Sequence, residues 1–480
     1  ARRDREAVSE LKPFLTDSGL QVAAAAADAL GKLATTDAAT CLRETLATAP
    51  SELRPAVGRA ALACADRLRR QENCSEAKAT LEALRKTELP LGLIAAATRG
   101  LMLCRPEEAA GLLAGEIAAP EGIRFAMALG AVGELPTHSV TKVLVDRLPA
   151  LSEDRQALVI TALGDRGDKA AREAVVKATD STTPAVRIAA IRALATLGDV
   201  STIALLLDAA AESDPEVTAA ALASLASLSG AGVDAAIISM LEEPQGDHYR
   251  IVVALAGRRQ IASAIPALLK AADSTEPPTR LAAIASLGET IGAVRIPVLT
   301  RRLLAPTGAE ETAAVQTALR NVCRRSVERD ACAKRLVECL PGASRETRAF
   351  LLELLGSIGG PTALKAVSAA ALDEDEQIRD TATRVLGEWH SPEVAPALLD
   401  VTGNLPAGKY RVRALRGALR ALRQMDIAQE RRLAMCHEAM QLADRNEERA
   451  LAVEVFGRIP SPVSLAVVVP LLQTAELKAA

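Results

Sequence analysis

The feature that most constrains this chain is a recurring unit of about 31 residues. Residues 170–199, 261–288 and 361–387 each contain an apolar stretch of helical periodicity, an acidic or proline-containing turn, and a second such stretch. Arg187 and Arg280 occupy equivalent places and lie 93 positions apart, which is three periods. A two-helix unit of this size cannot bury its apolar face alone, so it must stack on its neighbours. The repeat therefore predicts a row of helical hairpins.

The composition agrees with closely packed helices. The chain has 480 residues and is 49% hydrophobic, yet it contains only 1 Trp, 2 Tyr and 4 Phe. Sheet-based cores need more aromatic and β-branched bulk than this, so an all-α fold is expected. The net charge of -3 provides no global positive field to attract nucleic acid or an anionic membrane. No apolar run approaches the roughly 18 residues that a membrane span needs.

Small residues mark the expected inner helix faces and helix ends. Alanines such as Ala189 and Ala282 are predicted to let helix axes approach closely. Four glycines near the expected ends of second helices are predicted to terminate them in the left-handed conformation. They are Gly198, Gly288, Gly356 and Gly387.

The pattern Asp/Pro…Val-Arg-x-x-Ala-x-x-Ala-Leu-x-x-Leu-Gly resembles the HEAT repeat, including the kind named after bilin lyases. This resemblance implies an α-solenoid, a right-handed superhelix of about 14 hairpins. It also implies a structural ladder in which a turn Asp and a second-helix Arg tie hairpins together. The matching couples are Asp180 with Arg187, Asp273 with Arg280, and Asp373 with Arg379, the last one residue shorter in spacing.

We expect the whole of residues 1–480 to form one solenoid. The approximate units are 3–38, 40–72, 74–106, 107–138, 139–169, 170–200, 201–232, 233–260, 261–294, 295–329, 330–360, 361–390, 391–426 and 427–460, followed by a partial unit at 461–480. The lone apolar helix of that partial unit would cap a solenoid poorly, which predicts that the chain is truncated at its C-terminal end.

No residue pattern predicts catalysis, a metal site or a cofactor site. The four histidines do not form HExxH or CxxCH, no CxxC occurs, and no phosphate-binding loop follows a strand pattern. The tripeptide Arg166-Gly167-Asp168 is interpreted as an inter-helix turn and not as an adhesion motif. We therefore expect this segment not to be an enzyme, and a catalytic domain beyond Ala480 stays open.

The strongest charge feature is the stretch 409–423, which carries six cations and no acid. These residues are Lys409, Arg411, Arg413, Arg416, Arg420 and Arg423. The spacing of the last four places them on one helix face. One interpretation is a patch that binds an anion or an acidic partner. The other is a set of arginines paired with acids of neighbouring helices, such as Glu388 or Glu447.

Two pairs of cysteines have similar spacing at the junction of successive hairpins. They are Cys64 with Cys74 and Cys323 with Cys332. Two disulfides are one interpretation, and export from the cytoplasm would follow from them. The alternative is small buried thiols in a reducing compartment.

The sequence best fits a non-catalytic scaffold or spacer that binds a protein partner. The resemblance extends to large exported bacterial HEAT arrays, which implies a periplasmic or extracellular location; a cytoplasmic one stays open. Two alternatives are polyanion or nucleic-acid binding through residues 409–423, and a bilin-lyase-like enzyme. The shortage of aromatics disfavours both nucleic acid and a tetrapyrrole.

Overall fold

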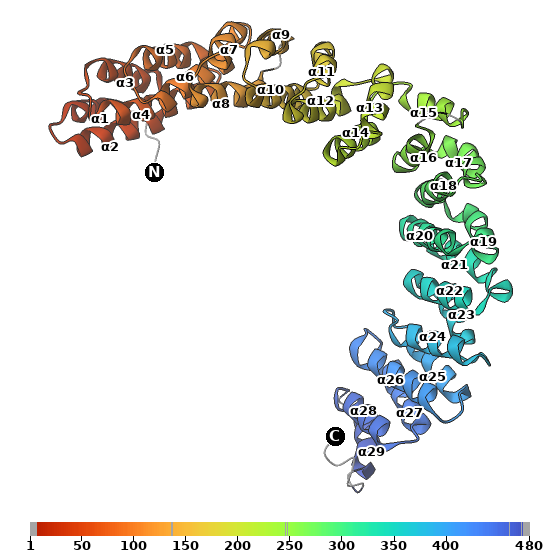
Figure 1. The fold of residues 1–480 in the computed structure, drawn as a ribbon. Coiled ribbons are helices and arrows are strands. Elements are labelled where there is room, and N and C mark those ends of the chain that lie inside the picture. Colours follow the sequence, from red (N-terminus) through yellow and green to blue (C-terminus); the bar gives the residue numbers. More distant parts are fainter. Residues whose placement is uncertain are drawn as a thin grey trace. The chain divides into compact units, whose positions relative to one another are not determined.

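The computed structural model describes residues 7–135, 138–244, 246, 248–459, 461–471 and 473. Residues 472 and 474–480 of the expected partial unit therefore lie outside the described residues. Within the described chain, the elements are α-helices and short 3-10 helices (written η), with no strand (Figure 1). The predicted all-α, solenoid class of fold is confirmed.

The chain divides into two compact units, Ala1–Ala236 and Ile237–Ala480, and each is described by itself. The helices of the first unit are α1 (Val8–Leu11), η2 (Lys12–Thr16), α2 (Leu20–Leu33), α3 (Thr36–Thr48), α4 (Arg54–Arg70), α5 (Cys74–Lys86), α6 (Leu91–Cys104), α7 (Ala109–Ile117), α8 (Gly122–Ala131), η3 (Val132–Glu134), α9 (His138–Arg147), η4 (Leu148–Ala150), α10 (Glu153–Arg166), η5 (Lys169–Ala171), α11 (Arg172–Ala178), α12 (Pro184–Leu197), η6 (Val200–Thr202), α13 (Ile203–Ala210) and α14 (Pro215–Ser227).

The boundary between the units falls inside α15 (Val233–Leu241). The second unit continues with α16 (Tyr249–Arg258), η7 (Ala262–Ala264), α17 (Ile265–Ala272), α18 (Pro277–Thr290), η8 (Ala293–Arg295), α19 (Ile296–Leu304), α20 (Ala309–Arg325), α21 (Arg329–Val337), η9 (Leu340–Gly342), α22 (Arg345–Ile358), α23 (Pro361–Ala370), α24 (Glu376–Gly387), α25 (Val394–Asn404), α26 (Lys409–Gln424), α27 (Gln429–Leu442), α28 (Asn446–Gly457) and α29 (Pro462–Leu471).

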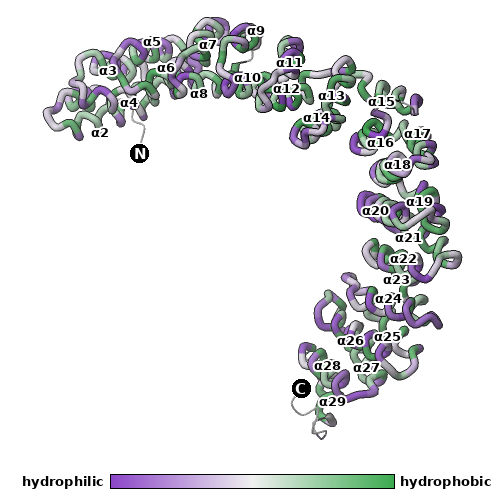
Figure 2. Tube along the Cα trace, in the orientation of Figure 1, coloured by the Kyte–Doolittle hydropathy of each residue, from purple (hydrophilic) through white to green (hydrophobic). Residues whose placement is uncertain are grey.

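Within each unit the helices form two rows. Even-numbered helices pack on one another, as in α10, α12 and α14 of the first unit and α16, α18 and α20 of the second. We call this the even row and the other helices the odd row. Apolar and polar residues are interspersed along the helices (Figure 2), and the buried residues are mainly alanine, leucine, valine and isoleucine. Across the described residues, no helix combines the length and the hydrophobicity that crossing a membrane requires.

Local chemistry explains where helices begin. At the start of α14, the Asp214 carboxylate accepts hydrogen bonds from the backbone N–H groups of Glu216 and Val217. Pro215 occupies the first helical position, where a missing N–H costs nothing. Asp375 caps α24 in the same way, accepting from the N–H groups of Gln377 and Ile378.

The four glycines predicted to end helices in the left-handed conformation do not do so. Gly288 lies inside α18, and Gly356 lies inside α22. Gly198 follows α12 with a φ of -70°, and Gly387 is the last residue of α24 without a positive φ. Gly288 is needed for close packing: a Cβ there would lie 2.7 Å from the Cα of Ala318 in α20. At Gly288 and Gly356 the leucine-glycine pattern therefore marks a close contact with the next even-row helix.

Candidate functional site

Ion pairs between successive hairpins bring together the side chains that the sequence singles out. Arg187 does not pair directly with Asp180. Its Nε donates to the Thr179 carbonyl in its own turn at 3.0 Å. Its two terminal nitrogens donate to the Glu212 carboxylate of the next hairpin at 2.8 and 2.6 Å. Arg187 thus stabilises the turn of its own hairpin and binds the next hairpin.

The second predicted couple behaves in the same way. Arg280 donates to the Ser274 carbonyl at 2.8 Å and to the Glu311 carboxylate of the next hairpin at 3.2 Å. Asp273 pairs with Arg302 in the next hairpin instead of with Arg280. Each member of the couple therefore reaches across to the adjacent hairpin.

In the third couple, Arg379 donates to the backbone carbonyls of Asp373 and Glu374, each at 3.0 Å. The Asp373 side chain pairs with Arg348 of the preceding hairpin. All three couples thus place an arginine on carbonyls of its own turn, while the carboxylates of Asp273 and Asp373 pair with arginines one hairpin away.

The cations of the stretch 409–423 lie on α26 and are engaged by neighbouring helices. The ion pairs are Lys409 with Glu376, Arg411 with Asp444, Arg413 with Asp380, Arg416 with Glu448, and Arg423 with Glu454. Arg420 donates to the Trp389 carbonyl at 3.0 Å. Anion binding by these residues stays a prediction, and a bound anion would have to compete with five internal pairs. The acids differ from the Glu388 and Glu447 named from the sequence.

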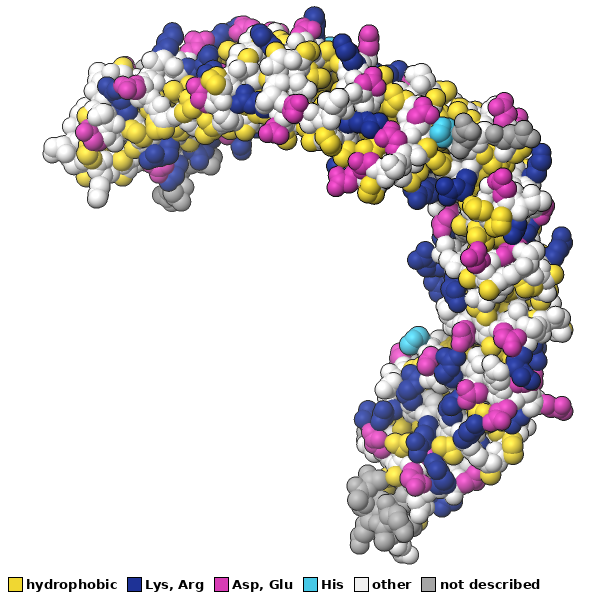
Figure 3. Space-filling model, viewed as in Figure 1, with side chains coloured by type: hydrophobic (Ala, Val, Ile, Leu, Met, Phe, Trp, Pro, Cys, Tyr) yellow, Lys and Arg dark blue, Asp and Glu magenta, His cyan; other side chains and the backbone are white. Residues whose placement is uncertain are grey.

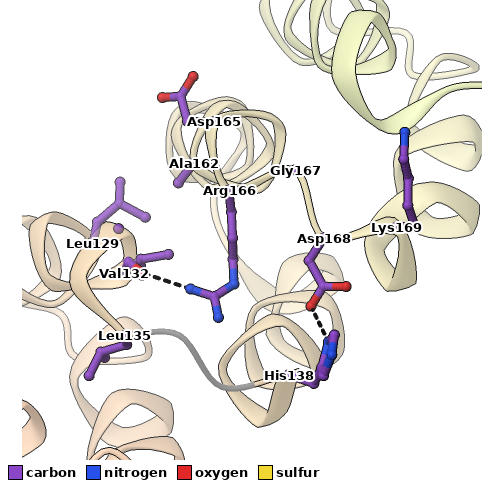
Figure 4. A pocket seen from close by; sticks show the side chains of 11 residues that line it. Leu129, Val132, Leu135, His138, Ala162, Asp165, Arg166, Gly167, Asp168 and Lys169 are labelled. Atoms are coloured by element: carbon purple, nitrogen blue, oxygen red, sulfur yellow. Dashed lines mark hydrogen bonds and ion pairs between the residues drawn. The ribbon is translucent and has the colours of Figure 1, made fainter. Parts of the chain in front are cut away.

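A pocket of about 650 Å³ surrounds the Arg166-Gly167-Asp168 turn (Figure 4). Gly167, with a φ of 69°, ends α10, which confirms the interpretation as a turn. Arg166 points inward and donates to the Val132 carbonyl at 2.7 Å and to the Thr141 hydroxyl at 2.8 Å. Its guanidinium is therefore not presented to an external receptor.

Asp168 completes this junction between hairpins. Its carboxylate accepts hydrogen bonds from the Thr141 hydroxyl at 2.6 Å and the His138 Nδ1 at 2.8 Å. These bonds, with the Thr141 bond the strongest influence, lower the pKa of Asp168 to about 2. The Thr141 hydroxyl gives its proton to Asp168 and accepts from Arg166, so it is not poised as a nucleophile. The hydrogen bonds among these side chains therefore hold adjacent hairpins together.

The described residues contain no group of three or more His, Cys, Asp and Glu side chains arranged to hold a metal ion. His437 packs edge-on against the Phe456 ring, with the ring centres 5.3 Å apart. This histidine therefore contributes to the contact between α27 and α28.

In the structure all eight cysteines are free thiols, and the two disulfides stay predictions. Cys64 is buried on α4 and is not bonded to Cys74 in the structure. The thiol of Cys74 instead hydrogen-bonds with Cys104 at the same end of the α5–α6 hairpin. Cys323 and Cys332 do have adjacent, hydrogen-bonded thiols, and burial raises the pKa of Cys323 to about 12.

Three grooves run across the even row. Their volumes are about 410 Å³ between α4 and α6, 460 Å³ across α10, α12 and α14, and 750 Å³ across α16, α18 and α20. We call them the α4, α10 and α16 grooves. Small side chains such as Ala96, Ala189 and Ala285 line their floors. A further groove of about 840 Å³ lies on the odd row between α23 and α25.

Sequence reasoning did not identify the cations around the α16 groove. Arg258 lines this groove at the end of α16, and Arg320 and Arg324 lie on α20 one turn from its lining residues Thr317 and Asn321. Figure 3 shows Lys and Arg side chains gathered over α16 and α20. The four-residue spacing of Arg320 and Arg324 places both on one helix face and was the only sequence signal for this cluster. The arginines are not part of a continuous run of cations.

Comparisons with known proteins support the repeat. A sequence profile for HEAT repeats matches residues 141–226, 235–320 and 333–416, together just over half of the chain. No curated protein sequence matches this chain.

Among solved structures, one similar chain comes from a study of Kap95p binding to RanGDP and nuclear import complex assembly. It shows 13% identity and a TM-score of 0.40, and the match covers 98% of this chain and 69% of that one. Another comes from Kap121p bound to Nup53p, with 12% identity and a TM-score of 0.47; this chain spans 58% of it, and 98% of this chain is covered. Human deoxyhypusine hydroxylase with glycerol shows 17% identity and a TM-score of 0.23, covering 58% of this chain and 96% of the other.

Proposed function

The chain belongs to the HEAT-repeat family, and from this premise we propose that it is a non-catalytic scaffold that binds a protein partner along its even row. The observation that carries the proposal is the recurrence of grooves on that row. The α4, α10 and α16 grooves each lie between consecutive even-row helices. A surface that repeats in this way suits an extended partner better than a compact small molecule.

The side chains in these grooves support binding and not chemistry. The α10 groove combines exposed apolar Leu158 with the charged residues Asp165, Arg192 and Glu216 at its border. Exposed apolar side chains beside charged ones are common on protein-binding surfaces. None of the three even-row grooves is lined by histidine or cysteine, which are the side chains most often used as bases or nucleophiles.

A photo-crosslinking experiment tests the proposal. A photoreactive amino acid would replace Leu158 or Ala285 on the even row, or the exposed Val294 or Val327 elsewhere, in the full chain expressed in its source cells. We expect discrete protein adducts from the two even-row positions only. Equal labelling at all four positions, or no discrete adduct on the even row, would contradict the proposal. Circular dichroism would check that each variant keeps its helical content.

We further propose that this scaffold forms part of a larger exported bacterial protein, as the family resemblance implies. The adjacency of the Cys323 and Cys332 thiols supports this setting, because a disulfide there would join α20 to α21. Titration of thiols in the denatured, unreduced protein from its natural source provides the test. We expect the number of free thiols to be at least two lower than the eight cysteines of the sequence. A count of eight would count against export.

A further inference from the structure

The α16 groove is bordered by cations that the protein itself leaves uncompensated. Arg258, Arg320 and Arg324 are exposed, and within the described residues none of them forms an ion pair. Arg324 contacts only the side-chain oxygen of Asn321, at 3.4 Å. Arg320 lies over the Phe350 ring at 4.8 Å, a contact that leaves its charge in place. Arg250, about two turns before Arg258 on α16, is also exposed and without an ion pair in this part of the structure.

The other even-row grooves have this property to a smaller extent. In the α4 groove, Arg69 and Arg70 pair with Asp66, and Arg99 pairs with Glu134. The fourth lining arginine, Arg59, is exposed and has no ion pair in the described part of the chain. In the α10 groove, the single cation Arg192 is accompanied by two acids at the lining. Within the described residues, the α16 groove therefore has three unpaired arginines at or beside its lining, against one in each of the other two even-row grooves.

One acid lines the α16 groove, and its charge offsets part of the positive charge of the three arginines. Glu289 lies one repeat away from both Arg258 and Arg320, yet its carboxylate accepts a hydrogen bond from the Asn321 amide at 2.6 Å. The rest of the floor is formed by small side chains, including Ala254, Ala282 and Ala313. Such a floor lets the main chain of a ligand come close to the helices.

We propose that the α16 groove binds an acidic segment of a protein partner, whose carboxylates lie against Arg258, Arg320 and Arg324. This inference rests on the proposed scaffold function and adds the chemistry of the partner. Helix axes in contact lie roughly 8–10 Å apart, so the path from α16 to α20 is about 20 Å. At about 3.3 Å per residue, an extended segment of about six residues spans it.

A protein segment fits this groove better than a nucleic acid. Single-stranded nucleic acids are usually held by aromatic side chains that stack on the bases, and no aromatic residue lines the α16 groove. The net charge of the chain is -3, which opposes a long polyanion beyond the local cluster. A short acidic segment needs only the local cations.

The test is a binding titration of the full chain with a fluorescein-labelled peptide of twelve residues that alternates glutamate and serine. We expect saturable binding by fluorescence anisotropy that weakens as salt rises. The double variant R258E/R324E should bind about tenfold more weakly or worse, and it leaves the Arg320 contact with Phe350 untouched. The control variant R295E/R301E makes the same charge change at two exposed, unpaired arginines of η8 and α19, and should bind like the original protein.

Several outcomes would overturn the inference. These are no binding of the acidic peptide, equal loss in both variants, or binding of a twelve-nucleotide single strand with no binding of the peptide. Thermal unfolding of both variants would verify that they are folded. If crosslinking finds partners on the even row while the peptide fails to bind, the scaffold function stands and the proposal of an acidic segment is contradicted. If the peptide binds at Arg258 and Arg324 but no crosslinks form, the acidic preference of the α16 groove stands and partner binding along the even row is contradicted.

Discussion

Replacing Gly288 by alanine is expected to lower the free energy of unfolding by about 2–3 kcal/mol. The new Cβ would stand 2.7 Å from the Cα and 2.8 Å from the Cβ of Ala318. Atoms of this kind normally stay well beyond 3 Å apart, so α18 and α20 would have to separate. Both belong to one closely packed row, and a wider spacing there removes contacts along the whole interface. Urea unfolding followed by circular dichroism measures the change.

Gly387→Ala is the matched control, since nothing lies within 4 Å of the position that its Cβ would take. Gly387 is the last residue of α24 and lacks a positive φ. Alanine there should change stability by less than about 1 kcal/mol, in the stabilising direction, because it restricts the unfolded chain. If both glycines had ended helices in the left-handed conformation, both substitutions would be destabilising. Equal loss in the two variants would therefore contradict the close-packing account.

The repeat period and the helical class could be predicted because they depend on the order of apolar residues along the chain. A spacing of about 31 residues recurs between Arg187 and Arg280. It places equivalent residues on stacked hairpins whatever the details of their contacts. The role of Gly288 could not be predicted in the same way. A glycine near a helix end serves a turn or a close contact, and only the position of Ala318 one repeat later decides between them.

The ion pairs show a similar limit. Sequence spacing identified the residues of the ladder but not the partners, because Arg280 can reach its own turn or the next hairpin. In the structure it does both, through the Ser274 carbonyl and the Glu311 carboxylate. Likewise, the run of cations on α26 was conspicuous in the sequence, although acids on neighbouring helices neutralise most of it. The uncompensated cations of the α16 groove are fewer and spread over two helices, so only the three-dimensional arrangement distinguishes them.

Replacing Glu311 by alanine is expected to cost about 3–5 kcal/mol of stability, the largest effect of a single substitution proposed for this protein. The Glu311 side chain is 4% exposed, and it accepts from Arg280 and Arg302 at 3.2 Å each and from the Thr307 hydroxyl. The two arginine side chains are only 18% and 19% exposed. Removal of the carboxylate takes the buried partner from two poorly hydrated guanidinium groups, of which Arg302 keeps Asp273 and Arg280 keeps the Ser274 carbonyl. The cost therefore exceeds that of a surface ion pair.

Glu310→Ala serves as the control, because Glu310 is the exposed neighbour on the same first turn of α20. Its loss should change stability by less than about 0.5 kcal/mol. Thermal and urea unfolding of the three proteins at neutral pH provide the comparison. A loss below about 1 kcal/mol for Glu311→Ala would show that Arg280 and Arg302 find other partners or water.

The pH dependence of unfolding gives a second, independent reading of the same cluster. Burial acts to raise the pKa of Glu311, but hydrogen bonds from Thr307 and Arg302 and the charges of Arg302 and Arg280 outweigh it, so the pKa lies below its usual value. A carboxyl group whose native pKa is lowered contributes stability that is complete above its unfolded pKa of about 4.3 and is lost as pH falls through the native pKa. Glu311→Gln should therefore be less stable than the original protein at pH 7, and the difference should shrink as pH falls below about 4. A difference that stays constant down to pH 3 would mean that the charge of Glu311 does not hold the two hairpins together.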